Sequence, residues 1–356
     1  MGLPNINIEF KTTAGSAVTR QARGVVGLIV KDAATDAQGE HVLTDELGIP
    51  STLGADNKAY ISRAFLGYVN RPSKVIVYVL ETDAANLNDA LAYFATQQID
   101  YMAGPPDCTA EEATAIASWV AARREEDMVP KAVLPNKAAD SEAIINFTTA
   151  GILADGKEYT AAQYCSRIAG LLAGTPLTIA STYAPLSEVT DITRLTKEEM
   201  DTAIDAGQFI LYHDGTKVKV GRGVNSLVTT NQDKGEAFKK IKIVEAVDTM
   251  RRDIMVTAQD NYIGKYANSY DNKCLLISAI QGYFTELENQ GVLQQGSSTV
   301  GIDLEQQRIY LSSRGIDVSK MTDQQIKEAD TGDQVYLAAT VKILDAIEDI
   351  HLIVKI

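Results

Sequence analysis

Between residues 24 and 206, short apolar runs alternate with segments of helical periodicity, and this alternation limits the possible folds more than any other feature of the chain. The runs are too short for buried helices and read as strands that are covered on both faces. Strands that alternate with helices predict a mostly parallel sheet between two helical layers, an α/β domain over residues 21–206. The expected strands are 25–30, 75–80, 99–103, 129–134 and 144–148, and the expected helices are 58–66, 84–94, 109–126 and 161–172.

Local signals mark the ends of several of these elements. Thr109 followed by Glu112 has the spacing of a capping box, and Asp83 is the expected N-cap of the preceding helix. Asp155-Gly156 predicts a tight turn before the helix that starts near Thr160.

After residue 206 the rhythm changes, and residues 207–356 are expected to form an α+β domain. Asp214-Gly215 between two alternating runs predicts a hairpin with a type I′ turn. Two long helices follow, over 238–258 and 276–287, and Gly291 is the expected stop of the second. A short helix is expected near 322–329.

Both ends of the chain carry alternating apolar and polar residues, the period of a half-buried strand. Residues 1–20 are predicted to be an N-terminal arm, and residues from about 333 to 356 a terminal strand pair or arm. Such strands leave unpaired edges unless a neighbour fills them, so we expect them to pair with other subunits. The expected contact positions are Ile6, Ile8 and Phe10 in the first arm and Ile350, Leu352, Val354 and Ile356 in the second.

Composition excludes several classes of partner. The formal net charge is −14, which disfavours nucleic acid, and no apolar run is long enough for a transmembrane helix, so membrane insertion is not expected. The three cysteines are far apart and indicate a reducing compartment. The segment GILADGK (151–157) has the spacing of a phosphate-binding loop, but Glu158 stands where Ser or Thr is required. No catalytic, cofactor-binding or metal-binding residues are predicted, and the chain is not expected to be an enzyme.

Four segments together resemble the tail sheath proteins of contractile phages and of phage-derived R-type bacteriocins: RIAGLLAGTPLTIASTY (167–183), DTMRRDI (248–254), DNYIGKY (260–266) and GYFTELENQGVL (282–293). The resemblance implies an α/β domain of subtilisin-like topology without catalytic residues, followed by a C-terminal domain. It also implies terminal arms that complete the sheets of adjacent subunits.

The same resemblance implies a function. The subunit would polymerise helically around an inner tube, and contraction would drive the tube through a bacterial envelope. Its partners would be further copies of itself, the tail tube protein, and the baseplate and tail terminator proteins. Assembly would occur in the bacterial cytoplasm, and the product would be a virion tail or a released phage-tail-like particle.

Two other classes of protein stay open at this point. One is the sheath of another contractile injection machine, and the other is a nucleotide-binding α/β enzyme, against which Glu158 argues. The residues do not distinguish a phage with a head from a headless bacteriocin.

Overall fold

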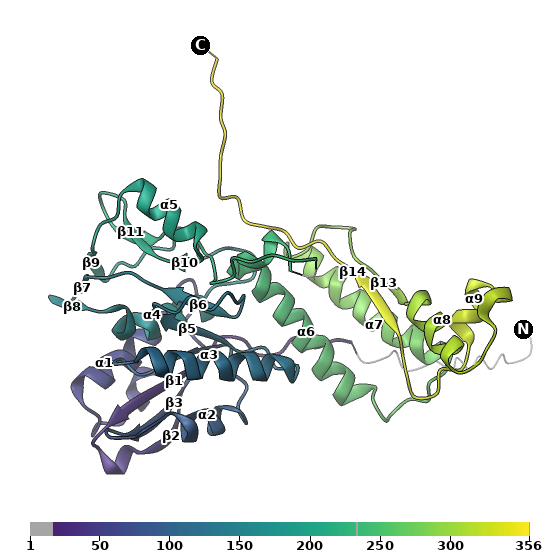
Figure 1. The fold of residues 1–356 in the computed structure, drawn as a ribbon, viewed down its shortest axis with the longest axis horizontal. Coiled ribbons are helices and arrows are strands. Elements are labelled where there is room, and N and C mark those ends of the chain that lie inside the picture. The colour runs from purple at the N-terminus through teal and green to yellow at the C-terminus, as the bar shows by residue number, and fades with distance from the viewer. Residues whose placement is uncertain (1–16, 233, 356) are drawn as a thin grey trace, which may run out of the picture. The chain divides into compact units, whose positions relative to one another are not determined.

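The computed structural model describes residues 17–232 and 234–355 (Figure 1). The expected arm positions Ile6, Ile8, Phe10 and Ile356 lie outside the described residues. The chain packs as two compact units. We call residues 21–232 and 234–249 with 345–355 the sheet unit, and residues 17–20 with 250–344 the helical unit.

A seven-stranded sheet forms the centre of the sheet unit, in the order β10-β6-β5-β4-β1-β3-β2. All neighbours are parallel except β2, which runs antiparallel to β3. The mostly parallel sheet is therefore confirmed, with all five strands expected from the apolar runs. The strands are β1 (Val25–Asp32), β2 (Gly39–Leu43), β3 (Lys74–Glu81), β4 (Tyr101–Ala103), β5 (Lys131–Pro135), β6 (Ile144–Phe147) and β10 (Gln208–Phe209).

Strand β1 shows why these runs are continuously apolar. Val26 and Leu28 join one hydrophobic core, whereas Val25 and Ile29 join the other. Because side chains alternate between the faces of a strand, a strand with a core on each side needs apolar residues at both sets of positions.

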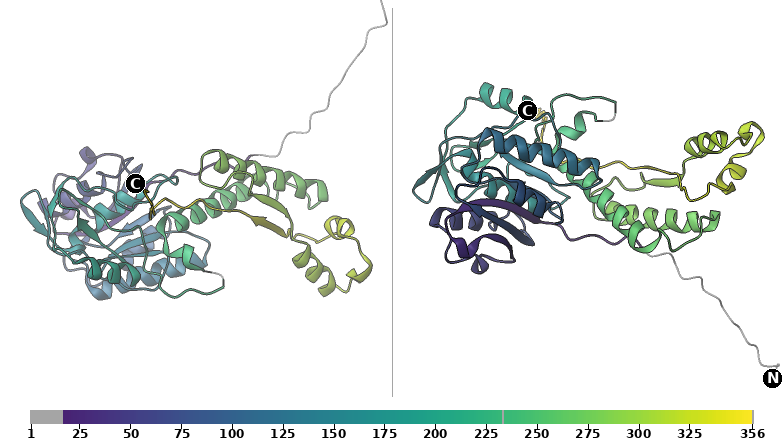
Figure 2. Two further views of the ribbon diagram at one scale, coloured as in Figure 1. Left: turned by 90° about the horizontal axis from the view of Figure 1, so that it is seen from above. Right: turned by 60° about the horizontal axis from the view of Figure 1, so that its bottom comes forward.

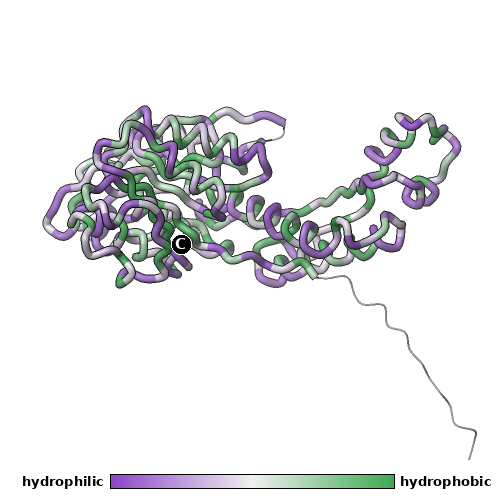
Figure 3. Tube along the Cα trace, turned by 90° about the horizontal axis from the view of Figure 1, so that it is seen from below, coloured by the Kyte–Doolittle hydropathy of each residue, from purple (hydrophilic) through white to green (hydrophobic). Residues whose placement is uncertain are grey.

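Helices supply the other half of each core. Helices α1 (Ala55–Ala64) and α4 (Ala161–Ala173) pack in the core that contains Val26, and α2 (Asn88–Phe94) and α3 (Ala110–Glu125) pack in the core that contains Val25. Figure 2 gives two further views of these layers, and Figure 3 shows the hydrophobic interior of the sheet unit. The four helices expected in this region are thus present.

The division of the chain differs from the one expected at residue 206. Strand β10 pairs with β6, and Leu211 and Val218 lie in the core with Val26, so this region packs with the sheet unit. The remaining elements of the sheet unit are β7 (Ile152–Ala154), β8 (Lys157–Tyr159), β9 (Val189–Asp191), α5 (Lys197–Asp205), β11 (Leu211–His213), β12 (Val218–Val220) and the 3-10 turns η1 (Thr35–Ala37), η2 (Glu46–Gly48) and η3 (Glu236–Lys239).

Two local predictions are confirmed. The capping box of Thr109 and Glu112 is present at the start of α3. The Asp155-Gly156 turn joins β7 to β8, with φ values of 51° and 72°. Positive φ at both central residues is the requirement of a type I′ turn.

Two others are wrong. Helix α2 begins only after Leu87, which makes no side-chain cap, so Asp83 is not its N-cap. At the β11–β12 hairpin, Gly215 has a φ of 100° but Asp214 is not among the residues with positive φ, so the turn is not type I′. The Asp214 carboxylate instead accepts hydrogen bonds from the backbone N–H groups of Thr216 and Lys217, which stabilises a four-residue loop.

Helix α6 (Ile241–Asn261) begins in the sheet unit and ends in the helical unit. Gly291, with a φ of 74°, follows the C-cap of α7 and confirms the predicted stop. The other elements of the helical unit are α7 (Tyr270–Asn289), β13 (Thr299–Ile302), α8 (Leu304–Ser313), the 3-10 turn η4 (Val318–Lys320), α9 (Asp323–Glu328) and β14 (Leu337–Thr340).

The predicted pairing of the two terminal strands is wrong. Strand β14 pairs antiparallel with β13, a strand that sequence analysis missed, and not with the run that begins at Ile350. Residues 345–355 form no strand within the described parts of the chain. In the sequence of β13, TVGI, Val300 and Ile302 alternate with Thr299 and Gly301, but four residues that include a glycine are too short a pattern to identify a strand.

Gly170 permits the close approach of α1 and α4, because an added Cβ would lie 1.9 Å from the carbonyl oxygen of Ala64. We expect Gly170→Ala to lower the stability of the purified chain by about 3 kcal/mol, since the two helices must move apart. Gly282→Ala is the matched control: an added Cβ in α7 meets nothing within 4 Å, so it should be neutral or stabilise by about 0.5–1 kcal/mol. Thermal denaturation measures both, and an unchanged melting temperature for Gly170→Ala would contradict the packing argument.

Candidate functional site

The C-terminal run is uncovered. Ile350, Leu352 and Val354 are 80%, 79% and 72% exposed, and Ile353, on the opposite face of an extended chain, is 85% exposed. Apolar side chains gathered on an exposed segment mark an interaction site. The structure therefore places three of the predicted arm residues together on a free segment, while their contacts with another subunit stay a prediction.

The helical unit contains a second candidate interaction site, the β13–β14 sheet. It has only two strands, and among the described residues no third strand pairs with either outer edge. The sheet is continued toward α7 by hydrogen bonds from Gln294 N–H to the carbonyl oxygen of Lys342 (2.8 Å) and from Leu344 N–H to that of Val292 (2.9 Å). Two-stranded sheets are marginally stable, and unpaired edges can accept further strands.

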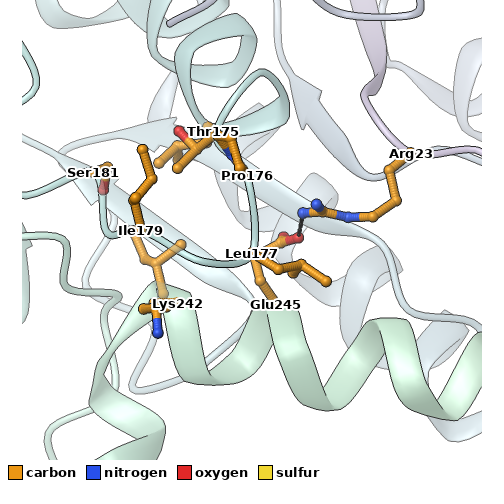
Figure 4. A pocket seen from close by; sticks show the side chains of 10 residues that line it. Arg23, Thr175, Pro176, Leu177, Ile179, Ser181, Lys242 and Glu245 are labelled. Atoms are coloured by element: carbon orange, nitrogen blue, oxygen red, sulfur yellow. Dashed lines mark hydrogen bonds and ion pairs between the residues drawn. The ribbon is translucent and has the colours of Figure 1, made fainter. Parts of the chain in front are cut away.

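A buried cluster of charges holds the first turns of α6 in the sheet unit. The ammonium of Lys131 lies 2.9 Å from a carboxylate oxygen of Glu245 and 3.2 Å from one of Asp248. Arg124 binds both oxygens of Asp248, each at 2.9 Å, and Arg23 pairs with Glu245 (Figure 4). Both carboxylates lie on one face of α6, three residues apart, so the cluster ties this helix to β5 and α3.

The electrostatics of this cluster are those of a permanently charged structural network. Burial by itself would lower the pKa of Lys131, but the carboxylates of Glu245 and Asp248 outweigh it and raise that pKa. Burial would likewise raise the pKa of Glu245, but Lys131 and Arg23 outweigh it and lower the pKa to about 2. Neither group titrates near neutral pH, so the cluster is unsuited to acid–base catalysis.

The cavity beside this cluster is too small for a ligand. Figure 4 shows Leu177, Ile179 and Lys242 around it, and its volume is about 10 Å³, enough for one water molecule. Segment 151–157 contains β7 and the predicted turn at Asp155-Gly156. Lys157 is 68% exposed at its side chain, and its only ion-pair partner in the described chain is Asp56 at 3.9 Å.

The histidines have local roles or lie on the surface. His41 Nε2 lies 2.7 Å from the carbonyl oxygen of Ala37, His213 Nδ1 accepts a hydrogen bond from Gly215 N–H, and His351 is exposed. Within residues 17–232 and 234–355 there is no group of three or more potential metal ligands. No helix in that part of the chain is both long enough and apolar enough to cross a membrane.

Comparison with known proteins identifies the family of this chain. The family model described as the phage tail sheath protein central domain matches residues 81–226, and that of the phage tail sheath C-terminal domain matches residues 233–356. The tail sheath protein of Clostridium phage phiCD119 is 43% identical over 360 residues, with 99% of each chain covered. The chain belongs to the phage tail sheath protein family. It is a structural sheath subunit.

This sheath protein also has more distant relatives and structures of similar fold. The phage-like element PBSX protein XkdK of Bacillus subtilis is 27% identical over 224 residues, which cover 59% of this chain and 48% of that protein. The helical sheath of the anti-feeding prophage in its contracted state has the same fold, with a TM-score of 0.69, 16% identity and coverage of 100% and 99% of the two chains. The sheath tail protein of Desulfitobacterium hafniense also has a TM-score of 0.69, at 19% identity and coverage of 84% and 94%.

Sequence analysis found the exposed run at the end of the sheath protein but missed β13 and the charge cluster. A signal for the cluster was available in the sequence: Asp248 lies four residues after Val244, on the apolar face of the predicted helix, and the structure leaves it 3% exposed. A charged residue on the apolar face of a predicted helix indicates a buried partner.

Proposed function

We propose that this sheath protein polymerises helically around an inner tube and that contraction of the polymer drives the tube through a bacterial envelope. The observation that carries the proposal is the 43% identity to a phage tail sheath protein along the whole chain. The likeness in fold to a sheath in its contracted state supports the same function.

Strand exchange through the terminal arms is the proposed mode of assembly. The arm of residues 1–20 and the C-terminal arm each add a strand to a neighbouring subunit, and the open edges of β13 and β14 are the acceptors. Each ladder hydrogen bond contributes a net stabilisation of about 0.5–1.5 kcal/mol, so several per arm hold neighbours together while their bodies move. Exposure of Ile350, Leu352 and Val354 supports this assignment, because it leaves their apolar faces available.

The domain roles follow from the same proposal. The α/β domain begins at residue 21, includes β10 to β12, and has subtilisin-like topology without catalytic residues, and the C-terminal sheath domain follows it. The parallel sheet between two helical layers supports the first assignment. The free energy for contraction comes from better contacts between subunits in the contracted lattice, without nucleotide hydrolysis or any other enzymatic step.

The proposed partners are further copies of this chain, the tail tube protein, and the baseplate and tail terminator proteins. A chain of similar fold, 17% identical, occurs in the baseplate structure of the anti-feeding prophage, which supports contact with a baseplate. Assembly takes place in the bacterial cytoplasm. The sheath then forms part of a virion tail or of a released R-type-bacteriocin-like particle, and microscopy of particles from producing cells distinguishes the two by the presence of a head.

A second candidate is the sheath of another injection machine, favoured by the full-length likeness to the anti-feeding prophage sheath. A nucleotide-binding enzyme is not supported, because the exposed β7–β8 turn provides no cradle for phosphates.

We expect the purified chain to form tubes or rings by itself at high protein concentration, because its arms and open edges complement each other. Light scattering and negative-stain microscopy measure this outcome. Persistent monomers, or polymers that need a second, different sheath chain, would contradict self-assembly of a single phage-type subunit.

A further inference from the structure

The segment between Leu344 and the exposed run is held by ion pairs to its own sheet unit. Lys240 Nζ pairs with Asp345 and lies 3.4 Å from a carboxylate oxygen of Glu348. Arg222 Nε lies 3.3 Å from the same Glu348 oxygen, and Arg222 Nη2 lies 2.6 Å from Asp349. Three carboxylates of residues 345–349 thus face two cations: Lys240, which precedes α6, and Arg222, which follows β12.

Glu348 is the centre of this contact. Its side chain is only 7% exposed, and its second carboxylate oxygen accepts a hydrogen bond from the hydroxyl of Thr182. An exposed ion pair contributes little to stability. The carboxylate of Glu348 is instead largely buried and is shared by two cations and a hydroxyl, and such a network restricts the position of the side chain. The apolar side chains on either side are not covered with it, since Ile347 is 88% and Ile350 is 80% exposed, so polar contacts and not apolar packing hold this segment.

We propose that Arg222, Lys240 and Thr182 form a root clamp that binds Asp345, Glu348 and Asp349 and fixes the point at which the C-terminal arm leaves its own subunit. This inference rests on the proposed function of that arm in strand exchange. The arm then begins at Ile350, not at the end of the β14 region, and residues 345–349 stay with the sheet unit in the free and in the assembled subunit.

The clamp limits the reach of the arm. An extended chain spans about 3.3 Å per residue, so the seven residues 350–356 span about 23 Å, whereas the twelve residues 345–356 would span about 40 Å. The partner is a second copy of this chain, and its acceptor strand must lie within the shorter distance of Asp349. A short, anchored arm also loses less conformational entropy on docking than a longer free one, which favours polymerisation.

A protease that cleaves after glutamate tests the clamp on unassembled chain, at a concentration where light scattering detects no polymer. The protease must take the Glu348 side chain into its own pocket, so the clamped residue is protected. We expect the double variant Arg222→Gln, Lys240→Gln to be cleaved after Glu348 about ten-fold faster than the parent. Mass spectrometry of the released peptide 349–356 measures the rate of cleavage. Lys239→Gln is the matched control, because it removes a neighbouring charge whose ion-pair partner among the described residues is Glu236 on its own turn.

The parent chain provides a measurement that does not depend on folding of a variant. Raising the salt concentration from about 50 mM to about 500 mM should accelerate cleavage after Glu348 in the parent, because salt screens exposed parts of the cluster. Cleavage after Glu305, outside the clamp, is the internal reference. If the parent is cleaved after Glu348 as fast at low salt as at high salt, or the double variant is cleaved no faster than the parent, the clamp is overturned.

The polymerisation assay then separates the clamp from the proposed function. A released tail should raise the protein concentration needed for assembly of the double variant by about ten-fold, while Lys239→Gln leaves it unchanged. Absence of polymer from the parent chain would overturn the proposed self-assembly through the arms but not the protease result. Normal assembly of a double variant with accelerated cleavage would show that anchoring is dispensable for the arm.

Discussion

Ile353→Pro is expected to abolish polymer formation while leaving the subunit folded. The residue is 85% exposed and forms no strand in the described single chain, so the substitution disturbs little in the monomer. In an added strand, proline removes a ladder donor and fixes φ, and the loss of a few hydrogen bonds is repeated at every subunit contact. Circular dichroism, thermal denaturation and light scattering together measure the outcome.

Ile353→Ala is the control, because it keeps the backbone N–H and should preserve assembly better than proline does. Ile8→Pro in the N-terminal arm, outside the described residues, is expected to behave like Ile353→Pro. Normal polymers from both proline variants would mean that the arms do not join subunits. Loss of the cooperative melt would instead place these segments within the fold of their own subunit.

Asp248→Asn is expected to cause the largest loss of stability among charge substitutions. Asp248 is 3% exposed and binds Arg124 through both oxygens, so the amide leaves Arg124 and Lys131 buried with too little negative charge. Removal of one partner from a buried ion pair costs about 3–5 kcal/mol, which corresponds to a melting temperature lower by roughly 10 °C for a unit of this size.

Calorimetry measures that change, and Asp201→Asn is its matched control. Asp201 pairs with Lys197 one turn away on the exposed side of α5, so neutralising it should not shift the melting temperature measurably. A melting temperature of Asp248→Asn equal to that of the parent would show that the buried cluster is energetically neutral.

The same cluster predicts how stability depends on pH. Glu245 has a folded-state pKa of about 2, below its ordinary value of 4.5, because Lys131 and Arg23 outweigh the effect of burial. A group with a depressed folded pKa binds more protons in the unfolded chain, so its contribution is complete above pH 4.5 and is lost as the pH falls toward 2. Calorimetry across that interval should show a steeper decline for the parent than for Glu245→Gln.

The positions of helices and strands in the sheet unit follow from the sequence because their causes are local or averaged over one segment. Apolar runs identify β1 and β3, since both of their faces are buried whichever elements cover them. The capping box at Thr109 and the turn at Asp155-Gly156 depend only on residues within four positions of one another.

These local signals do not identify which segments of the chain pair or pack with one another. The alternation around Leu337 indicates a strand but does not identify β13 as its partner, and the Asp-Gly pair at 214–215 forms a longer loop because the Asp214 side chain satisfies the backbone locally. The contacts of Asp248 with Arg124 and Lys131 join residues more than 100 positions apart.

The sequence by itself determined the alternating strand and helix pattern, one capping box and one tight turn, the uncovered apolar end and the family of this sheath protein. Only the tertiary structure decided the pairing of β14 with β13, the buried charge cluster and the anchoring of residues 345–349. The reason is physical: periodicity records which faces of a segment are buried, whereas the identity of the covering segment depends on chain geometry in three dimensions.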